Sequence, residues 1–185
     1  MSVYKIVDLD KIFCGDLRFI MNSKKDYCDS IFIDADLSGV DLKNIVMKRA
    51  SFKKVSFEKS DLSGADLSGS CAISSYRPYS NNFSGAKLIT ANLSGVDFSG
   101  ANFKEADLRS ANLSSAKLKS PRFEGADLRG ANLCGVKFDG ISFFDGANLT
   151  GAIMAKSDLC NGSRHQDEAV KNAIDLFLSM GVIFV

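Results

Sequence analysis

Large apolar residues recur at every fifth position along the middle of the chain. In residues 91–113, ANLSGVDFSGANFKEADLRSANL, a Leu or Phe stands at positions 93, 98, 103, 108 and 113. An α-helix would place apolar residues three or four apart, and a strand would place them two apart. A step of five turns a helical side chain by about 140° and moves a strand side chain to the opposite face of the sheet. The pattern therefore predicts neither element as a continuous segment.

The same register continues over most of the chain. It runs through residues 30–69, resumes at residue 71 after Ser70 as one extra residue, and continues to residue 145. Gly146 is a second extra residue, unless Phe144 is the apolar centre of its unit and the extra residue comes earlier. The last units cover residues 147–161, which makes 26 units of five residues in all.

The other positions of the unit are also regular. Two residues before each apolar centre the side chain is small, usually Ala, and the residue directly before the centre is usually Asp or Asn. Ser, Gly, Lys, Arg or Glu follow the centre. We therefore expect two positions in five to be buried and three to face water. Repetition at a fixed spacing is typical of a solenoid, in which each repeat contacts only its neighbours.

The units ADLSG, ANLSG, ANFKE, ADLRS, ANLSS, ADLRG and ANLTG resemble the motif A(D/N)LXX of the pentapeptide-repeat proteins. The resemblance covers about residues 30–161. It implies an all-β solenoid, a right-handed quadrilateral β-helix in which each unit forms one side and four units form one coil. The expected organisation is a β-helix over residues 1–161, irregular before about residue 30, followed by a C-terminal segment at 162–185.

The spacing of the phenylalanines independently favours coils of twenty residues. Phe83, Phe103, Phe123 and Phe143 are twenty residues apart, and they would stack along one inner side of the solenoid. A second inner column would contain Phe98, Leu118 and Phe138, with Phe57 in the equivalent position of an earlier coil.

The C-terminal segment leaves the fivefold register and takes up helical spacing. Val170, Ile174, Phe177 and Leu178 recur at helical intervals. Ser163 and Gln166 read as an N-terminal capping box, and Gly181 is a C-terminal stop. The VIFV that follows is expected to form a short apolar strand. Such an end would pack against the last coil, against a second subunit, or against both.

Composition and charge exclude several classes of function. The formal net charge is +1, with 23 Lys and Arg against 22 Asp and Glu, which argues against direct nucleic-acid binding. No apolar run is long enough to span a bilayer, and no secretory signal is recognisable. The five cysteines form no CxxC pair. We therefore expect a reduced cytoplasmic protein with no membrane contact.

No group of residues has the pattern of a catalytic or metal site. The single histidine, His165, stands at the start of the expected helix. Cys134 and Cys160 take outward positions and lack a catalytic partner. The many Asp residues repeat at one position of the unit, where they are interpreted as turn and surface groups. We expect no enzyme activity, no cofactor and no metal.

Two surface features are candidates for binding a partner. One coil carries a basic belt, which would suit an acidic partner or be an ordinary solvated surface; its candidate residues are Lys43, Lys48, Arg49, Lys53 and Lys54. The second feature is YRPYS at residues 76–80, where Pro78 replaces the usual apolar centre. Its Tyr76 and Tyr79 would form either a contact site or a tolerated irregularity.

The ending AIDLFLSMGVIFV is similar to that of the quinolone-resistance subgroup of pentapeptide-repeat proteins (Qnr and MfpA). In that subgroup a terminal helix with the pattern L-x-x-x-G-[IV]-x-[IV] joins two solenoids end to end, and Leu176, Gly181 and Val182 approximate this pattern. The resemblance implies a homodimer. The implied interface residues are Ile174, Phe177, Leu178, Met180, Val182 and Phe184.

The same resemblance implies binding to a type II topoisomerase, DNA gyrase or topoisomerase IV. Such proteins protect the enzyme from quinolone-type or peptide poisons without catalysis, in some cases by mimicking duplex DNA. Duplex mimicry needs acidic stripes, whereas this chain has a formal charge of +1. The alternative is a scaffold or adaptor that binds an unrelated protein partner. A continuous negative stripe would favour the first hypothesis, and faces of mixed charge would favour the second.

Overall fold

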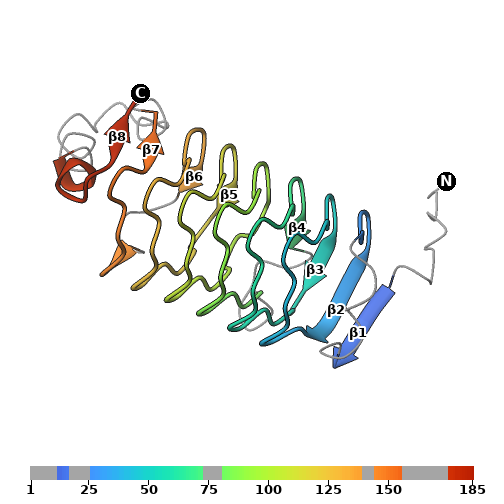
Figure 1. The fold of residues 1–185 in the computed structure, drawn as a ribbon. Helices are drawn as coiled ribbons and strands as arrows, with labels where there is room; N and C mark the ends of the chain where they lie inside the picture. Colours follow the sequence, from blue (N-terminus) through green and yellow to red (C-terminus); the bar gives the residue numbers. More distant parts are fainter. Residues whose placement is uncertain (1–11, 17–25, 73–80, 139–143, 156–174) are drawn as a thin grey trace, which may run out of the picture.

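The chain forms a right-handed quadrilateral β-helix, as a computed structural model shows in Figure 1. The structure describes residues 12–16, 26–72, 81–138, 144–155 and 175–185. Successive coils stack along one axis, so that segments about twenty residues apart in the sequence lie side by side.

The strands are short and pair only in parallel. Four of them form one sheet in the order β1-β2-β3-β4, and two further pairs are β5-β6 and β7-β8. Their bounds are Ile12–Asp16 (β1), Ile31–Asp36 (β2), Ser51–Lys53 (β3), Cys71–Ala72 (β4), Lys117–Leu118 (β5), Lys137–Phe138 (β6), Ile153–Met154 (β7) and Ile183–Phe184 (β8). Isolated parallel bridges continue the same stacking on the other sides of the coil.

The four sides of the coil define four faces, each identified by its central residues, which are buried except for the half-buried Ala72. The first face contains Phe32, Phe52, Ala72, Phe98 and Leu118; the second contains Leu37, Phe57, Phe83, Phe103, Phe123 and Phe144; the third contains Leu42, Leu62, Leu88, Leu108, Leu128 and Leu149; the fourth contains Tyr27, Met47, Leu67, Leu93, Leu113, Leu133 and Met154.

The unit from Asp61 to Ala65 shows how the backbone N–H groups of a repeat find their acceptors. The N–H groups of Leu62 and Gly64 donate to the next coil, and that of Asp61 donates to the preceding coil. The N–H of Ala65 donates to the carbonyl oxygen of Leu62 at 3.0 Å, which closes the corner. The remaining donor, the N–H of Ser63, bonds the Asp61 carboxylate at 3.2 Å. All five donors are thereby paired.

This hydrogen-bond pattern explains why Asp or Asn precedes the apolar centre. A backbone N–H left unpaired near the core costs about 1–3 kcal/mol, and a short side-chain oxygen two residues earlier can accept from it in an Asx turn. The same bond joins Ser84 N to Asn82 Oδ1 at 3.1 Å and Ser114 N to Asn112 Oδ1 at 3.1 Å. The Asp or Asn before the centre is therefore required by the fold, because its side chain completes the backbone hydrogen bonding of the unit.

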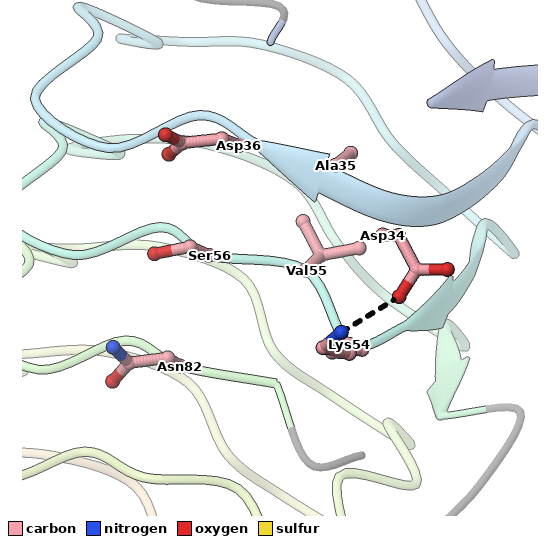
Figure 2. A pocket seen from close by; sticks show the side chains of 7 residues that line it. All are labelled: Asp34, Ala35, Asp36, Lys54, Val55, Ser56 and Asn82. Carbon is pink, nitrogen blue, oxygen red and sulfur yellow. Dashed lines mark ion pairs between the residues drawn. The ribbon is translucent and has the colours of Figure 1, made fainter. Parts of the chain in front are cut away.

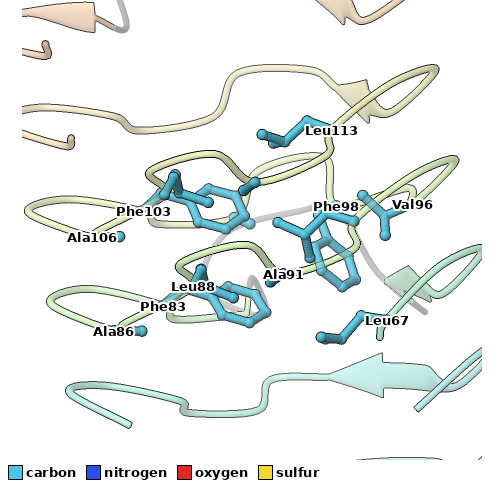
Figure 3. Close-up of a cluster of buried hydrophobic side chains, with 14 of the residues drawn as sticks. Leu67, Phe83, Ala86, Leu88, Ala91, Val96, Phe98, Phe103, Ala106 and Leu113 are labelled. Atoms are coloured by element: carbon cyan, nitrogen blue, oxygen red, sulfur yellow. The ribbon is translucent and has the colours of Figure 1, made fainter. Parts of the chain in front are cut away.

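The core contains the centre and the small residue of each side, as predicted. Figure 3 shows both kinds of side chain pointing inward from successive coils, for example Phe103 with Ala106 and Phe83 with Ala86. These four residues are at most 1% exposed. A small residue at the corner lets the chain turn closely around the large centres, which fill the narrow interior.

The phenylalanines of the second face form the expected ladder. The rings of Phe57, Phe83, Phe103, Phe123 and Phe144 stack in sequence with centroids 4.8–5.2 Å apart and interplanar angles of 6–13°. Each such pair contributes about 0.5–1.5 kcal/mol beyond the burial of its area. The last ring is that of Phe144, which confirms the alternative register and shows that Gly146 is not an extra residue; Phe143 lies outside the described residues.

The expected positions of Ser70 and Phe57 are wrong. Ser70 is buried at the small position of its unit, and Ala72 is the centre that pairs with Phe52. The bridge from Ser56 to Asn82 has an offset of 26 residues instead of 20, so six residues are inserted after Ala72. This insertion brings Phe57 onto Phe83 instead of into the column of Phe98.

The C-terminal residues cover the end of the solenoid. Residues 175–179 are helical, Gly181 has the positive φ of 81° that suits a helix stop, and β8 pairs in parallel with β7. The ring of Phe177 packs edge-on against that of Phe144, with centroids 5.7 Å apart. The expected packing against the last coil and the short apolar strand are therefore confirmed, whereas Ser163 and Gln166 lie outside the described residues.

Candidate interaction surfaces

Four of the five basic-belt residues form ion pairs with carboxylates within the chain. Arg49 forms a bidentate pair with Asp29, with Nε–Oδ1 at 2.8 Å and Nη2–Oδ2 at 2.7 Å. The other contacts join Lys43 to Asp61 at 3.3 Å, Lys48 to Asp66 at 3.0 Å and Lys54 to Asp34 at 3.3 Å. Because each partner is about twenty residues away, the pairing becomes visible only once the coils are stacked.

The belt also wraps around the molecule, so its residues do not share one surface. Lys53 and Lys54 belong to the first face, Lys43 to the third, and Lys48 and Arg49 to the fourth. One flat partner therefore cannot contact all five. A contiguous sequence segment makes a complete turn, so the belt runs around the coil and leaves only part of its charge on any one face. Tyr76 and Tyr79 lie outside the described residues.

Charges alternate in sign along the third face. Arg109 contacts Asp107 at 2.7 Å and Asp127 at 3.8 Å, and Arg129 contacts Asp127 at 2.6 Å. The hydrogen bonds from Arg129 hold the pKa of Asp127 below its ordinary value. Over the described part of this face no stretch carries negative charge alone.

Asp61 illustrates the same balance nearer the N-terminal end of the third face. Burial by itself would raise the pKa of this carboxyl, but hydrogen bonds from Ser63 and Lys43 outweigh that effect and lower it. Lys43 lies 3.3 Å from Asp61, and Lys87 lies 3.7 Å from it on the other side. Surface pairs of this kind contribute about 0–1 kcal/mol each to stability. Their main effect is on the surface charge that a partner would meet.

A small hollow lies at the corner between the first and second faces (Figure 2). Its volume is about 270 Å³, and its lining residues are Asp34, Ala35, Asp36, Lys54, Val55, Ser56 and Asn82. This volume is below the roughly 300–1,000 Å³ of ordinary ligand sites.

The side chain of Asn81 reshapes the same corner. The N–H of Val55 donates to Asn81 Oδ1 at 3.0 Å, while the buried Asn81 Nδ2 has no partner. Asn81 follows the six-residue insertion and takes a position where most units have Ala or Val. We therefore attribute the hollow to the end of the six-residue insertion, and we assign no cofactor to it.

Exposed apolar side chains gather at the C-terminal end. Among the described residues, the large hydrophobic side chains that are exposed are Leu176 at 43%, Leu178 at 53%, Ile183 at 53% and Val185 at 70%. All four belong to the helical residues or to the last strand and the residue after it. An apolar surface of this kind at one end of a molecule is typical of a contact with another protein.

The described residues contain no cluster of three or more His, Cys, Asp or Glu side chains arranged to hold a metal. His165 and Cys160 lie outside them, and Cys134 is half-buried on the fourth face. Within the same residues no helix is long and apolar enough to cross a membrane.

A family model for pentapeptide repeats matches residues 30–69, 82–119, 111–145 and 126–162. The chain belongs to the pentapeptide-repeat family. The gap in the match at residues 70–81 contains the insertion that separates Ala72 from Asn81. No protein of curated function matches the sequence of this pentapeptide-repeat protein.

Several solved pentapeptide-repeat structures are similar to this protein. Rfr23 from the cyanobacterium Cyanothece 51142 is 29% identical over 60% of this chain and 61% of its own, with a TM-score of 0.29. QnrB1, a plasmid-mediated fluoroquinolone resistance protein, is 19% identical over 93% of this chain and 89% of its own, with a TM-score of 0.45. HetL from Nostoc sp. strain PCC 7120, involved in heterocyst differentiation regulation, is 23% identical over 71% and 68%, with a TM-score of 0.33.

The residues expected at a dimer interface of this pentapeptide-repeat protein divide into four groups. Phe177 and Val182 are at most 4% exposed, so their side chains belong to the protein's own core. Leu178 is exposed, while Met180 and Phe184 are partly buried against the core. Ile174 lies outside the described residues. The exposed residues Leu176, Ile183 and Val185 are not among the predicted interface residues. Helical and strand spacing does not reveal which side of a capping segment meets the last coil.

Proposed function

We propose that this protein acts without catalysis, as a scaffold or adaptor that binds another protein, and that it self-associates through its C-terminal end. The observation that carries the proposal is the gathering of exposed apolar side chains at Leu176, Leu178, Ile183 and Val185. The outer faces of the repeats present mainly polar and charged groups, which water solvates well. The apolar end gains the most from being covered.

The charge distribution supports the adaptor over a duplex mimic. A protein that replaces DNA on a basic surface has to present negative charge along its length. Here Arg109 and Arg129 are interleaved with Asp107 and Asp127 on the third face. A partner that fits such a face is a protein with mixed charge rather than a basic saddle for DNA.

Light scattering over a range of protein concentrations tests the self-association. We expect a dimer for the wild-type protein and at least tenfold weaker association for Leu178→Asp. Thr90→Asp is the matched control, since Thr90 is exposed at a corner of the third face. A monomer at all concentrations, or equal effects of the two variants, would refute this part of the proposal.

Affinity capture tests the adaptor role. The bait is the wild-type protein beside three variants that each place a charge on one face: Ser84→Arg, Ser63→Arg and Ser94→Arg, on the second, third and fourth faces respectively. We expect one captured protein to be lost with one variant and retained with the other two. Capture that is equally strong with every variant would count against binding through an outer face.

A second candidate is protection of a type II topoisomerase, and the C-terminal end favours it. Of the residues in this pattern, Leu176 lies in the helical turn, Gly181 follows it with a φ of 81°, and Val182 directly precedes β8. On this hypothesis the protein would bind DNA gyrase or topoisomerase IV and reduce its poisoning by quinolones or peptides, by a route other than a uniformly acidic surface.

A gyrase supercoiling assay with and without ciprofloxacin tests the second candidate. Purified protein of known oligomeric state is titrated into both reactions. Relief of drug inhibition, or direct inhibition at low micromolar protein, would support the topoisomerase hypothesis. If a folded dimer changes neither reaction, the hypothesis is wrong and the adaptor remains.

A further inference from the structure

The levels of the fourth face are joined by a repeated pair of main-chain hydrogen bonds, where each coil counts as one level. The carbonyl of the small residue and the N–H of the centre together hold one residue of the next level. The Ile153 N–H donates to the Ala131 carbonyl at 2.9 Å, and the Leu133 N–H donates to the Ile153 carbonyl at 2.7 Å. One level later, the Ile183 N–H donates to the Ala152 carbonyl at 2.7 Å. Each level therefore offers the next one an acceptor and a donor.

The last strand, β8, leaves the same two groups open. They are the Val182 carbonyl and the Phe184 N–H, which flank Ile183. Among the described residues, none donates to the Val182 carbonyl and none accepts from the Phe184 N–H. Ile183 is 53% exposed and Val185 is 70% exposed, so the outer side of this strand is in water. An open strand edge with apolar side chains is a template for pairing with another strand.

The strand at the other end of the rod differs in this respect. The register between β1 and β2 shifts between Cys14 and Gly15, and Gly15 has a φ of 78°. A bulge of this kind bends and twists a strand, which makes its edge a poor template for further pairing. In contrast, β8 pairs with β7 without a register shift and contains only Ile183 and Phe184. The C-terminal edge is the one that is suited to pairing.

We propose that β8 pairs antiparallel with β8 of a second copy, about a two-fold axis that passes beside Ile183. The inference rests on the self-association proposed above and assigns the main-chain bonds that hold it. A two-fold contact brings the same surface of both copies together, so this surface has to match itself when rotated. Rotation places each Phe184 N–H on Val182 of the partner subunit, at the carbonyl oxygen, and the two resulting bonds are reciprocal.

This register agrees with the geometry of an antiparallel ladder. Two reciprocal bonds on either side of a residue pair make it a non-hydrogen-bonded pair, with Cα atoms about 4.5 Å apart. Ile183 therefore lies directly opposite Ile183 of the partner subunit. Both side chains occupy the outward position of the unit and are half exposed in one copy, so each removes apolar surface of the other from water.

The same rotation brings the two apolar ends together. Phe177 packs on the second face, and the Gly181 carbonyl accepts from Gly151 at a corner of the third face, so the helical residues cover these two faces at the end of the rod (Figure 1). The axis is perpendicular to the fourth face, which puts the two rods on one line. It also turns the third face of one copy toward the first face of the other. The helical residues therefore lie beside each other, where Leu176 and Leu178 are covered.

Disulfide trapping is the decisive experiment. Ile183→Cys in the full chain is oxidised with copper phenanthroline at a concentration where light scattering shows a dimer. The Cα separation of about 4.5 Å lies within the range of about 4.4–6.8 Å that a disulfide spans. We expect a covalent dimer as the main product, which a reducing agent dissociates. The wild type, treated in the same way, shows any bond formed through the natural cysteines.

Val185→Cys is the matched control. Val185 is the more exposed of the two residues and lies two positions further along the chain. In the proposed register it is offset from its counterpart by four residues, or about 13 Å along the strand, which is beyond the reach of a disulfide. We expect at least tenfold less covalent dimer than with Ile183→Cys. Equal yields from the two variants would overturn the register.

Amide exchange of Phe184, followed by nuclear magnetic resonance, is the second measurement. The wild-type dimer is compared with Leu178→Asp, which is expected to be monomeric. We expect the Phe184 N–H to exchange at least tenfold more slowly in the dimer, because it gains an acceptor there. The Leu133 N–H is the matched control, since it has the same unit position and is paired within the chain. Its exchange should agree within about twofold in the two proteins.

The outcomes separate this inference from the proposed function. A dimer that Leu178→Cys crosslinks and Ile183→Cys does not would overturn the strand pairing and leave self-association through the end intact. A protein that is monomeric at every concentration would overturn the inference and the self-association together, while the adaptor role would still depend on the capture experiment. An Ile183→Cys crosslink together with slow exchange of the Phe184 N–H would support the pairing of the two strands.

Discussion

The stacked phenylalanines of the second face make a strong test of how the core is stabilised. Phe83 and Phe103 are fully buried, with ring centroids 5.0 Å apart and an interplanar angle of 10°. Changing Phe103 to Leu keeps an apolar side chain that is usual at centres but removes two ring contacts, with Phe83 and Phe123. At about 0.5–1.5 kcal/mol a pair, the free energy of unfolding should fall by about 1–3 kcal/mol.

A double-mutant cycle isolates the contribution of one stacked pair. Urea unfolding of Phe83→Leu, Phe103→Leu and the double variant, followed by circular dichroism, should give a coupling energy of about 0.5–1.5 kcal/mol. Phe57 and Phe123 provide the matched control, because they belong to the same ladder three levels apart and share no ring partner. Their changes should add to within about 0.5 kcal/mol. Equal coupling in the two cycles would refute the idea that ring stacking, beyond apolar burial, stabilises the ladder.

Three further predictions follow from the hydrogen bonds, charges and turns. Asn112→Ala should lower the free energy of unfolding by about 1 kcal/mol because it removes the turn-closing acceptor, whereas Asn112→Asp keeps an acceptor and should change it by less than half as much in urea. Arg129→Gln should lower the free energy of unfolding only slightly at pH 7, because the pair with Asp127 is on the surface. The folded-state pKa of Asp127 lies below its ordinary value, so the contribution of the pair is present above that ordinary value and is lost as the pH falls through the folded-state value. Urea unfolding at pH 7 and pH 3 should show the difference between wild type and variant shrink at the lower pH. Gly64→Ala should lower the melting temperature more than Gly39→Ala, because both glycines have φ near 70° but only at Gly64 would a Cβ atom collide with a neighbouring side chain.

The sequence was sufficient to predict the fold because every unit repeats the same physical solution. A large centre such as Leu62, a small corner residue such as Ala65 and an Asp before the centre each perform one task, and the task is the same on all four faces. The position of the insertion was harder to predict. Ser70 and Ala72 satisfy the small and central positions as well as other residues do, so counting from either end could place the extra residues differently.

The surface could be predicted only in part, since its neighbours are distant in sequence. Lys43, Lys48 and Arg49 look like one basic segment when read in order, but stacking brings a carboxylate from an adjacent coil to each of them. The same applies to the C-terminal end. Phe177 and Leu178 are consecutive and equally apolar, and only the packing of Phe177 on Phe144 decides which of the two is exposed.

The regular offset between neighbouring coils has a consequence for the reach of the molecule. Most bridged residues are twenty positions apart, as Asn92 and Asn112 are. Deleting residues 91–110 would join Thr90 to Ala111, which has the same role as Ala91, so every later side chain would keep its orientation. The rod would become about 4.8 Å shorter. The length of the rod can therefore change in steps of one coil. The distance between two attached partners can then be set without redesigning either attachment surface.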